Sequence, residues 1–328
     1  MSMKKFLKSC SCILLVAMLA TLMSIATLAA PSNTSFSTAT QLSSDIGDHK
    51  VITGISTGTS VYYYLNATAG QQIYAAIYSM TGGANYDLRL YNSSQTLLAS
   101  STRTSSSIDY ISYNATYTGK YYVRIQAVSV SSTSYSCGFK VTKTCGVAGT
   151  SSTNSGYNRT SAKNYMDLYA ITPNPSYNDY TGNGGDCTNF ASQVVKAGGM
   201  ATISGSSSSE ACWYAYSETW KSATKFTNHW GTSSVGNGNK RAYSCQYFIG
   251  QDAINNYQTF IQNLKVGDII QRCQQSDSSR VHTMIIYQKD TNNILMAQHT
   301  GNKKNVNLNN YLNTYKTSFF VVIRVKQG

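Results

Sequence analysis

The segment around Cys187 carries the residue types that position and activate a thiol. Residues 184–199 read GGDCTNFASQVVKAGG, which predicts a glycine approach, Asp186 as the N-cap, a short helix and a glycine stop. A thiol in the first turn lies at the positive end of the helix dipole, which favours the thiolate that attacks a carbonyl carbon. The first-turn backbone N–H groups, at Asp186, Cys187 and Thr188, can receive the developing oxyanion. We therefore predict that Cys187 is a nucleophile beside an oxyanion site.

The base that would activate this thiol must be one of the four histidines in the chain. His49 belongs to a β-rich region, and His229 stands in an aromatic stretch where packing or surface exposure explains it. His282 and His299 remain as candidates. Each falls in an apolar and β-branched stretch that predicts a strand, and a turn at residues 288–293 joins the two strands.

The register of this hairpin makes a specific prediction about the two histidines. If Tyr287 pairs with Ile294 to close the hairpin, antiparallel counting places His282 opposite His299. Directly opposed residues share a face, with Cβ atoms about 4.5–5.5 Å apart. One imidazole can then orient the other, with His282 as the base toward Cys187 and His299 fixing its tautomer.

Other interpretations of these side chains remain open. The two histidines can be core residues that oppose each other by chance, and Cys187, His282 and His299 are also competent zinc ligands. A thiolate–imidazole pair needs fewer assumptions, so we expect no metal and no cofactor. Aromatic residues between the nucleophile and the histidines could wall a substrate groove, although aromatic core is the commoner role. The groove candidates are Trp213, Tyr214 and Trp220.

The N-terminal part of the chain, residues 51–145, reads as strands separated by turns. The predicted strands are rich in β-branched and aromatic residues and lie at 61–65, 72–77, 87–91 and 121–125. Regular spacing without a helical segment favours an antiparallel β-sandwich or jelly roll.

Residues 33–143 resemble the bacterial pre-peptidase C-terminal domain. The matching features are a tyrosine-rich strand followed by Ala69-Gly70-Gln71, then DLRLY at 87–91 and TGKYYVR at 118–124. The resemblance implies an accessory jelly roll beside an exported hydrolase. Some relatives hold calcium, but acidic groups are few in this region, and we predict no metal in it.

The first 29 residues predict a signal peptide. The positively charged n-region contains Lys4, Lys5 and Lys8, and an apolar h-region follows at 13–23. Small residues precede the predicted cleavage site after Ala29. The core is too short for a membrane span. We therefore divide the chain into a signal peptide (1–29), a β-sandwich accessory domain (30–145), a Gly/Ser/Thr/Asn-rich linker (146–156) and a second domain (157–328).

Six cysteines remain after signal removal: Cys137, Cys145, Cys187, Cys212, Cys245 and Cys273. An even number in an exported chain suggests disulfides. A free nucleophile at Cys187 leaves five, so at least one more must be unpaired. Bridges from Cys137 to Cys145 and from Cys212 to Cys245 are the pairings we consider.

The second domain resembles the putative amidase domain of secreted bacterial proteins. Four blocks agree in order and spacing: YNR at 157–159, GDCTNF and its helix, VGDIIQ at 266–271, and the two histidine strands ending in AQHT. That family is similar to the papain-like, NlpC-type cell-wall peptidases. The resemblance implies an α+β papain-like fold with Cys187 as nucleophile, His282 as base and His299 as the orienting residue.

The sequence thus predicts a secreted cysteine amidase or peptidase that acts through a thioester, with cell-wall peptide as substrate. The formal net charge of +13 suits anionic wall polymers as a further partner. No nucleic-acid motif is present, and no membrane contact is expected after signal cleavage. The alternatives are an acyl transferase that uses the same site and a wall-binding or adhesive protein without activity.

Overall fold

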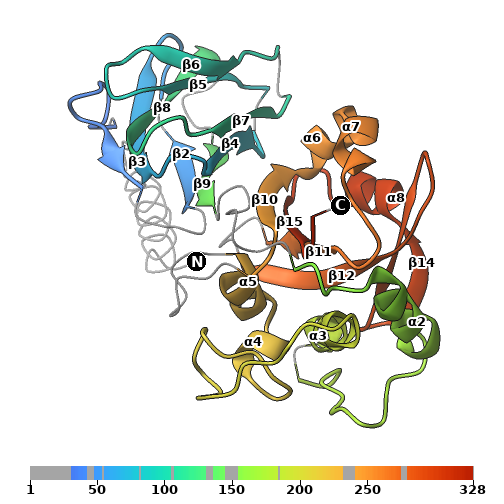
Figure 1. Cartoon of the computed structure of the whole chain (residues 1–328). Coiled ribbons are helices and arrows are strands. Elements are labelled where there is room, and N and C mark those ends of the chain that lie inside the picture. Colours follow the sequence, from blue (N-terminus) through green and yellow to red (C-terminus); the bar gives the residue numbers. More distant parts are fainter. Residues whose placement is uncertain are drawn as a thin grey trace, which may run out of the picture.

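The computed structural model describes residues 31–42, 48–53, 55–80, 83–104, 107–130, 136–144, 154–183, 185–231, 241–274 and 279–327. The predicted signal peptide lies outside this range, as do Cys145 and most of the predicted linker. Two bodies of structure follow each other along the chain, a β-domain and a domain of mixed helices and strands (Figure 1). Across the residues covered here, no helix is long and apolar enough to cross a membrane.

Two sheets form the N-terminal domain, as the strand pattern predicts. One has the order β1 (Thr40–Gln41), β3 (Ser60–Ala67), β8 (Gly119–Ser129), β5 (Asn85–Tyr91) and β6 (Leu97–Ser101). The other has the order β2 (Asp48–Thr53), β9 (Ser136–Thr144), β4 (Gln72–Tyr78) and β7 (Asp109–Asn114). Strand β8 alternates buried and half-buried residues, and apolar side chains of both sheets share one core. The predicted β-sandwich is confirmed.

The C-terminal domain is built on a six-stranded sheet. Its order is β10 (Ser244–Ile249), β15 (Phe319–Arg324), β11 (Ile269–Cys273), β12 (Arg280–Lys289), β13 (Ile294–Gln298) and β14 (Lys303–Asn307). The helices are α2 (Arg159–Tyr169), α3 (Cys187–Ala197), α4 (Glu218–Lys221), α5 (Ala223–Gly231), α6 (Gly250–Asn255), α7 (Tyr257–Gln262) and α8 (Leu308–Thr314). The sheet therefore has helices on both of its faces, an α+β arrangement.

Alternation along β12 separates the two faces. Thr283 hydrogen-bonds to Thr188 of α3, so α3 and α5 lie on the face that Thr283 shares with Gln271 of β11. The next residue, His282, points to the opposite face, where it neighbours Tyr311 of α8. We call these the α3 face and the α8 face.

The register of the β12–β13 hairpin differs from the prediction. Ile294 pairs with Lys289, not with Tyr287, and a bulge follows between Ile286 and Gln288. Beyond the bulge Ile285 pairs with Ala297, and continuing that register places Thr283 opposite His299. Strand β12 continues two residues beyond Tyr287, which alone would displace the predicted pairing by two residues. The bulge cancels one of these two, so each pair beyond it is displaced by one residue from the prediction.

A displacement of one residue moves a side chain to the other face of a sheet. His282 and His299 are therefore not a cross-strand pair: His282 lies on the α8 face and His299 on the α3 face. The predicted opposition of the two imidazoles is wrong.

The sandwich is docked on the edge strand of the C-terminal sheet. The Gln72 side chain bonds both ways with the backbone of Tyr247, at 2.9 and 3.1 Å. Tyr74 accepts the N–H of Ile249 at 3.0 Å and donates to Asp252 at 2.9 Å. Strand β4 is buried along its whole length, and Tyr74 and Tyr78 belong to the core of the C-terminal domain (Figure 1). The two domains thus share a packed, hydrogen-bonded interface.

The predicted bridge between Cys212 and Cys245 is not formed. Cys212 is a buried free thiol that donates a hydrogen bond to the carbonyl of Ser204. The other predicted bridge, from Cys137 to Cys145, falls outside the described residues.

Candidate active site

Helix α3 begins at Cys187, and Asp186 occupies its N-cap position as predicted, but the Asp186 side chain does not cap the helix. Its carboxylate instead accepts three other hydrogen bonds: from the backbone of Tyr180 at 3.0 Å, from Asn189 at 2.7 Å and from the His299 ring at 2.6 Å. Asp186 is only 2% exposed. It therefore anchors the loop before α3 and the end of β13 to the start of the helix.

His299 is engaged at both ring nitrogens. Nδ1 faces Asp186 Oδ2 at 2.6 Å, and Nε2 faces the carbonyl oxygen of Tyr169, at the end of α2, at 2.8 Å. Both partners are oxygen atoms, so each ring nitrogen of His299 has a hydrogen-bond partner within the protein. The ring also stacks on Phe190 with centroids 4.0 Å apart, and it is 1% exposed.

These contacts change the expected role of His299. Both ring nitrogens of His299 already have a hydrogen-bond partner, so neither is available to bond to His282 or to a metal ion. In this geometry His299 does not take the predicted orienting role, and both of its ring nitrogens are bonded to protein oxygen atoms. Within the described part of the chain, no group of three or more His, Cys, Asp or Glu side chains is arranged to hold a metal ion. The geometry makes His299 a structural partner of Asp186.

His282 does meet Cys187. Burial, the largest single effect, raises the pKa of the Cys187 thiol, but a hydrogen bond from His282 and the charge of that imidazole lower it. The backbone of Thr283 and the hydroxyl of Thr188 lower it further, and the net pKa lies below its ordinary value. A lowered pKa favours the thiolate form of Cys187.

A chain of hydroxyl and amide groups fixes α3 on the sheet just behind the thiol. Thr188 and Thr283 share a hydrogen bond of 2.7 Å between their hydroxyls, and Gln271 donates to Thr283 at 3.1 Å. Gln271 also donates to the carbonyl of Ala223 at the start of α5. All of the side chains in this network are buried, so the position of Cys187 over the strand is held by satisfied polar contacts.

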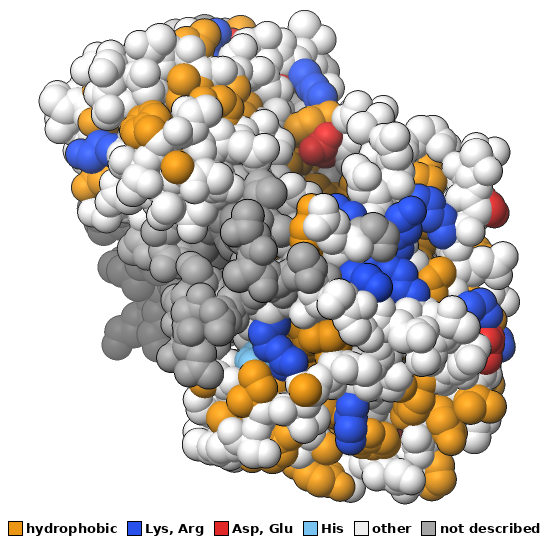
Figure 2. Space-filling model, viewed as in Figure 1, with side chains coloured by type: hydrophobic (Ala, Val, Ile, Leu, Met, Phe, Trp, Pro, Cys, Tyr) orange, Lys and Arg blue, Asp and Glu red, His pale blue; other side chains and the backbone are white. Residues whose placement is uncertain are grey.

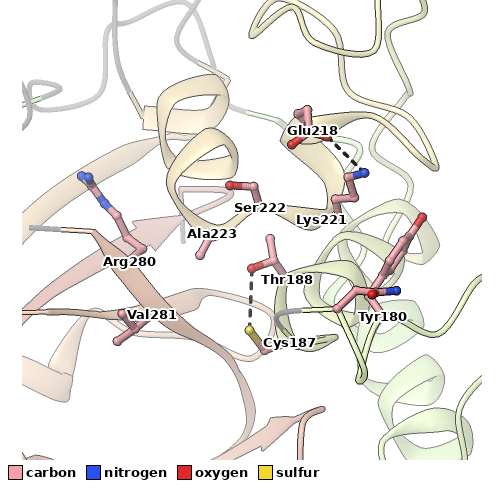
Figure 3. A pocket seen from close by; sticks show the side chains of 11 residues that line it. Tyr180, Cys187, Thr188, Glu218, Lys221, Ser222, Ala223, Arg280 and Val281 are labelled. Carbon is pink, nitrogen blue, oxygen red and sulfur yellow. Dashed lines mark hydrogen bonds and ion pairs between the residues drawn. The ribbon is translucent and has the colours of Figure 1, made fainter.

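A cavity of about 460 Å³ opens in front of Cys187. Figure 3 shows the Cys187 sulfur and the Thr188 side chain at its floor, with the α4–α5 segment above them. The cavity is lined by Tyr180, Asn183, Gly185, Cys187, Thr188, Glu218, Lys221, Ser222, Ala223, Arg280 and Val281. A substrate can therefore reach the thiol from this side.

The predicted oxyanion site is altered at one position. The backbone N–H of Asp186 donates to the Thr300 hydroxyl at 2.9 Å, so it is not available to a substrate. The N–H groups of Cys187 and Thr188 lie in the first turn of α3, where helix geometry provides no intrahelical acceptor. These two N–H groups remain the candidates for binding the oxyanion.

The predicted groove residues do not line the cavity. Trp213 and Trp220 are completely buried, with ring centroids 4.8 Å apart, and Tyr214 donates to the carbonyl of Gly205. The indole of Trp220 donates to Asn189 of α3 at 2.7 Å. The two tryptophans belong to the core that supports the nucleophile helix, and none of the three predicted groove residues lines the cavity.

Sequence reasoning missed residues of the α8 face. Tyr311 lies beside His282 with ring centroids 6.4 Å apart, and its hydroxyl accepts from Arg272, the strand partner of His282, at 3.2 Å. Burial raises the pKa of Tyr311. Tyr311 lies in a short Asn-rich helix without a motif, so no sequence signal marked it.

Two family models match parts of the chain. Residues 156–323 match the model of the family described as "Putative amidase domain", and residues 59–127 match the bacterial pre-peptidase C-terminal domain. Both resemblances stated from the sequence are confirmed, in the same order.

One curated relative and several solved structures are similar to parts of the chain. The relative is the uncharacterized protein YjcM of Bacillus subtilis (strain 168), 25% identical over 158 residues. That match covers 46% of this chain and 32% of YjcM, so the chain spans about a third of the length of this relative.

Among solved structures, the pre-peptidase C-terminal domain of the Bacillus anthracis collagenase is similar over 32% of this chain and 92% of its own, with 15% identity and a TM-score of 0.25. The periplasmic lysozyme inhibitor PliG of Aeromonas hydrophila is similar over 32% of this chain and 94% of its own, with 14% identity and a TM-score of 0.24.

Proposed function

Because this chain belongs to the putative amidase domain family, we propose that it is a cysteine-dependent amidase or peptidase with Cys187 as nucleophile and His282 as base. The observation that carries the proposal is the contact between His282 and a thiol of lowered pKa at the start of α3, open to a cavity. The arrangement of a nucleophile helix packed on an antiparallel sheet that carries the histidine supports a papain-like fold.

The proposed reaction is acyl transfer to the Cys187 sulfur. The thiolate attacks the carbonyl carbon of an amide in the cavity, and the N–H groups of Cys187 and Thr188 receive the oxyanion. The C–N bond then breaks as the His282 imidazolium gives its proton to the departing amine, which leaves a thioester.

Water completes the cycle. Neutral His282 takes a proton from a water molecule, and the resulting hydroxide adds to the thioester carbon. The C–S bond breaks, the acid leaves, and the thiolate–imidazolium pair is restored. Replacement of water by an amine at this step would make the enzyme an acyl transferase.

The substrate proposed is a peptide amide of the bacterial cell wall. The accompanying pre-peptidase C-terminal domain is typical of extracellular bacterial proteins, which supports secretion through the signal peptide predicted at residues 1–29. Basic side chains outnumber acidic ones on the visible face of the C-terminal domain (Figure 2), and a cationic surface favours anionic wall polymers as a further partner.

The proposal is tested by the paired variants Cys187→Ala and Cys212→Ala. Cys212 is a second buried thiol in the same domain, outside the cavity. With purified cell wall, we expect Cys187→Ala to lose release of amine-terminated peptide by at least 10³-fold, whereas Cys212→Ala retains it. Mass spectrometry of the products separates hydrolysis from transfer to an added amine. Equal rates in the two variants would contradict the cysteine mechanism, and wall binding without any turnover would favour the adhesive alternative.

A further inference from the structure

The His282 imidazole needs a partner on its second nitrogen. An imidazole serves as a base only when one tautomer is held with its lone pair toward the nucleophile, and a hydrogen bond at the other nitrogen normally sets that tautomer. His299 cannot supply it, because its ring is bonded to Asp186 and Tyr169 on the α3 face. Over the residues that the structure describes, His282 has a hydrogen bond only to Cys187.

Gln298 lies on the same face as His282. Ile285 pairs with Ala297, so the next pair in this register is Met284 with Gln298, and His282 stands diagonally across from Gln298. Diagonal neighbours in an antiparallel pair lie about 7–8 Å apart at Cα, within reach of a long side chain such as glutamine.

The Gln298 amide has an unused acceptor. Its Oε1 atom is buried and has no hydrogen-bond partner among the described residues. A buried carbonyl oxygen without a donor is costly and is rare in folded proteins, so its presence calls for an explanation. A ring N–H of the diagonal imidazole is a donor of the required kind.

The other polar groups around the imidazole do not meet the requirement. Arg272 of β11, which pairs with His282, offers only donors, and it bonds to the Tyr311 hydroxyl of α8. Cys187 of α3 occupies the reactive side of the ring. The Tyr311 hydroxyl already accepts from Arg272, so Gln298 of β13 supplies the acceptor on this face that has no donor among the described residues.

We propose that Gln298 is the positioning residue of the site: rotation of its amide, which is not bonded to His282 in this structure, lets Oε1 accept the N–H of the His282 ring nitrogen that faces away from Cys187. The inference rests on the proposed function. A neutral amide holds the ring without adding charge, so the second proton of the imidazolium stays available for the leaving amine. Gln298 thus takes the orienting role that was predicted for His299, the next residue in the chain.

The experiment compares Gln298→Leu, Gln298→Glu and the control Met296→Leu. Leu removes the acceptor at similar volume, Glu keeps an acceptor oxygen, and Met296 is a buried residue on the same strand and face. The readouts are the pH profile of Cys187 alkylation by iodoacetamide, and turnover on cell wall. We expect Gln298→Leu to lose about 10²-fold in turnover and to shift the alkylation profile to higher pH. Gln298→Glu should restore alkylation at neutral pH, and Met296→Leu should change neither.

A measurement on the unaltered protein covers the case in which a variant fails to fold. Long-range ¹⁵N–¹H spectra recorded at a pH high enough for the imidazolium to have lost one proton should show His282 in one neutral tautomer, assigned by its absence in His282→Gln. A mixture of both tautomers overturns the inference, as does a Gln298→Leu variant with the unaltered alkylation profile. A shifted profile together with no turnover by the unaltered protein supports the role of Gln298 and refutes only the proposed function.

Discussion

The two faces of the β12–β13 hairpin treat a histidine in opposite ways. On the α3 face, His299 has both nitrogens bonded, its ring stacked on Phe190 and almost no exposure. On the α8 face, His282 is half-buried, hydrogen-bonds to the Cys187 thiol and stands diagonally across from Gln298, whose Oε1 has no partner among the described residues. Both ring nitrogens of His299 are therefore occupied, whereas His282 can still exchange a proton with a reacting group.

This difference separates structure from chemistry within one hairpin. A group whose hydrogen bonds are all satisfied inside the protein contributes stability and cannot exchange protons with a substrate. A base must keep one nitrogen for the reacting group. The following changes should therefore affect activity on one face and stability on the other.

The largest effect is expected from His282→Ala. It removes the general base and the charge that holds the thiolate, so kcat/KM on cell wall should fall by about 10²–10⁴-fold. Because the ring is only half-buried, the midpoint of chemical denaturation should change little. Substantial destabilisation with retained activity would reverse the assignment of the two faces.

His299→Leu should show the opposite pattern. It removes the hydrogen bonds of the ring to the buried Asp186 carboxylate and to the Tyr169 carbonyl, and each buried polar group left unsatisfied costs about 1–3 kcal/mol of unfolding free energy. Urea denaturation measures the loss. The companion variant His299→Leu with Asp186→Asn removes the orphaned charge and should recover part of the stability. A stable His299→Leu protein that has lost only its activity would restore His299 to the catalytic group.

The pH dependence of Cys187 alkylation sharpens the comparison further. The net pKa of the thiol is lowered, so thiolate should persist at pH values where an ordinary thiol, with a pKa of about 8.5, is protonated. As pH falls, the alkylation rate of the native protein should decline later than that of the urea-unfolded chain. His282→Ala should move the decline to higher pH, whereas His299→Leu should leave it in place while the protein is folded.

The smallest effect is expected from Thr283→Val, on the α3 face. It breaks the hydroxyl network with Thr188 and Gln271 and leaves buried polar groups unpaired, at a cost of about 1–3 kcal/mol. Thermal unfolding measures the change, and Thr283→Ser, which keeps the hydroxyl, is the control. Equal stability of the Val and Ser variants would mean that packing alone holds α3 on the sheet.

The sequence predicted the elements of this site but not their mutual register. The glycine-flanked segment placed Cys187 at the start of α3, β12 carries His282 and His299 directly follows the end of β13, because these signals are local. The bulge near Tyr287 changes the register, and no residue type in 288–293 marks it. The longer strand and the bulge together displace the pairing by one residue, and the prediction without that displacement gave the orienting role to His299.

Side-chain partners were harder to predict than positions. Asp186 was placed at the N-cap, yet its carboxylate accepts from groups up to 113 residues away. The tryptophans were equally ambiguous, because burial and groove lining use the same aromatic residues, and only tertiary structure distinguishes them.

The docking of strand β4 also bears on the order in which the chain folds. Its outward tyrosines contact Ile249 and Phe319, which lie 175 and more residues later in the sequence. Because the chain is synthesised from the N-terminus, all strands of the sandwich are made long before β15. The apolar outer face of β4 therefore stays exposed to solvent until this last strand has been synthesised. We expect an isolated sandwich domain to self-associate through this face, and the nascent chain to need protection from aggregation until its C-terminus is made.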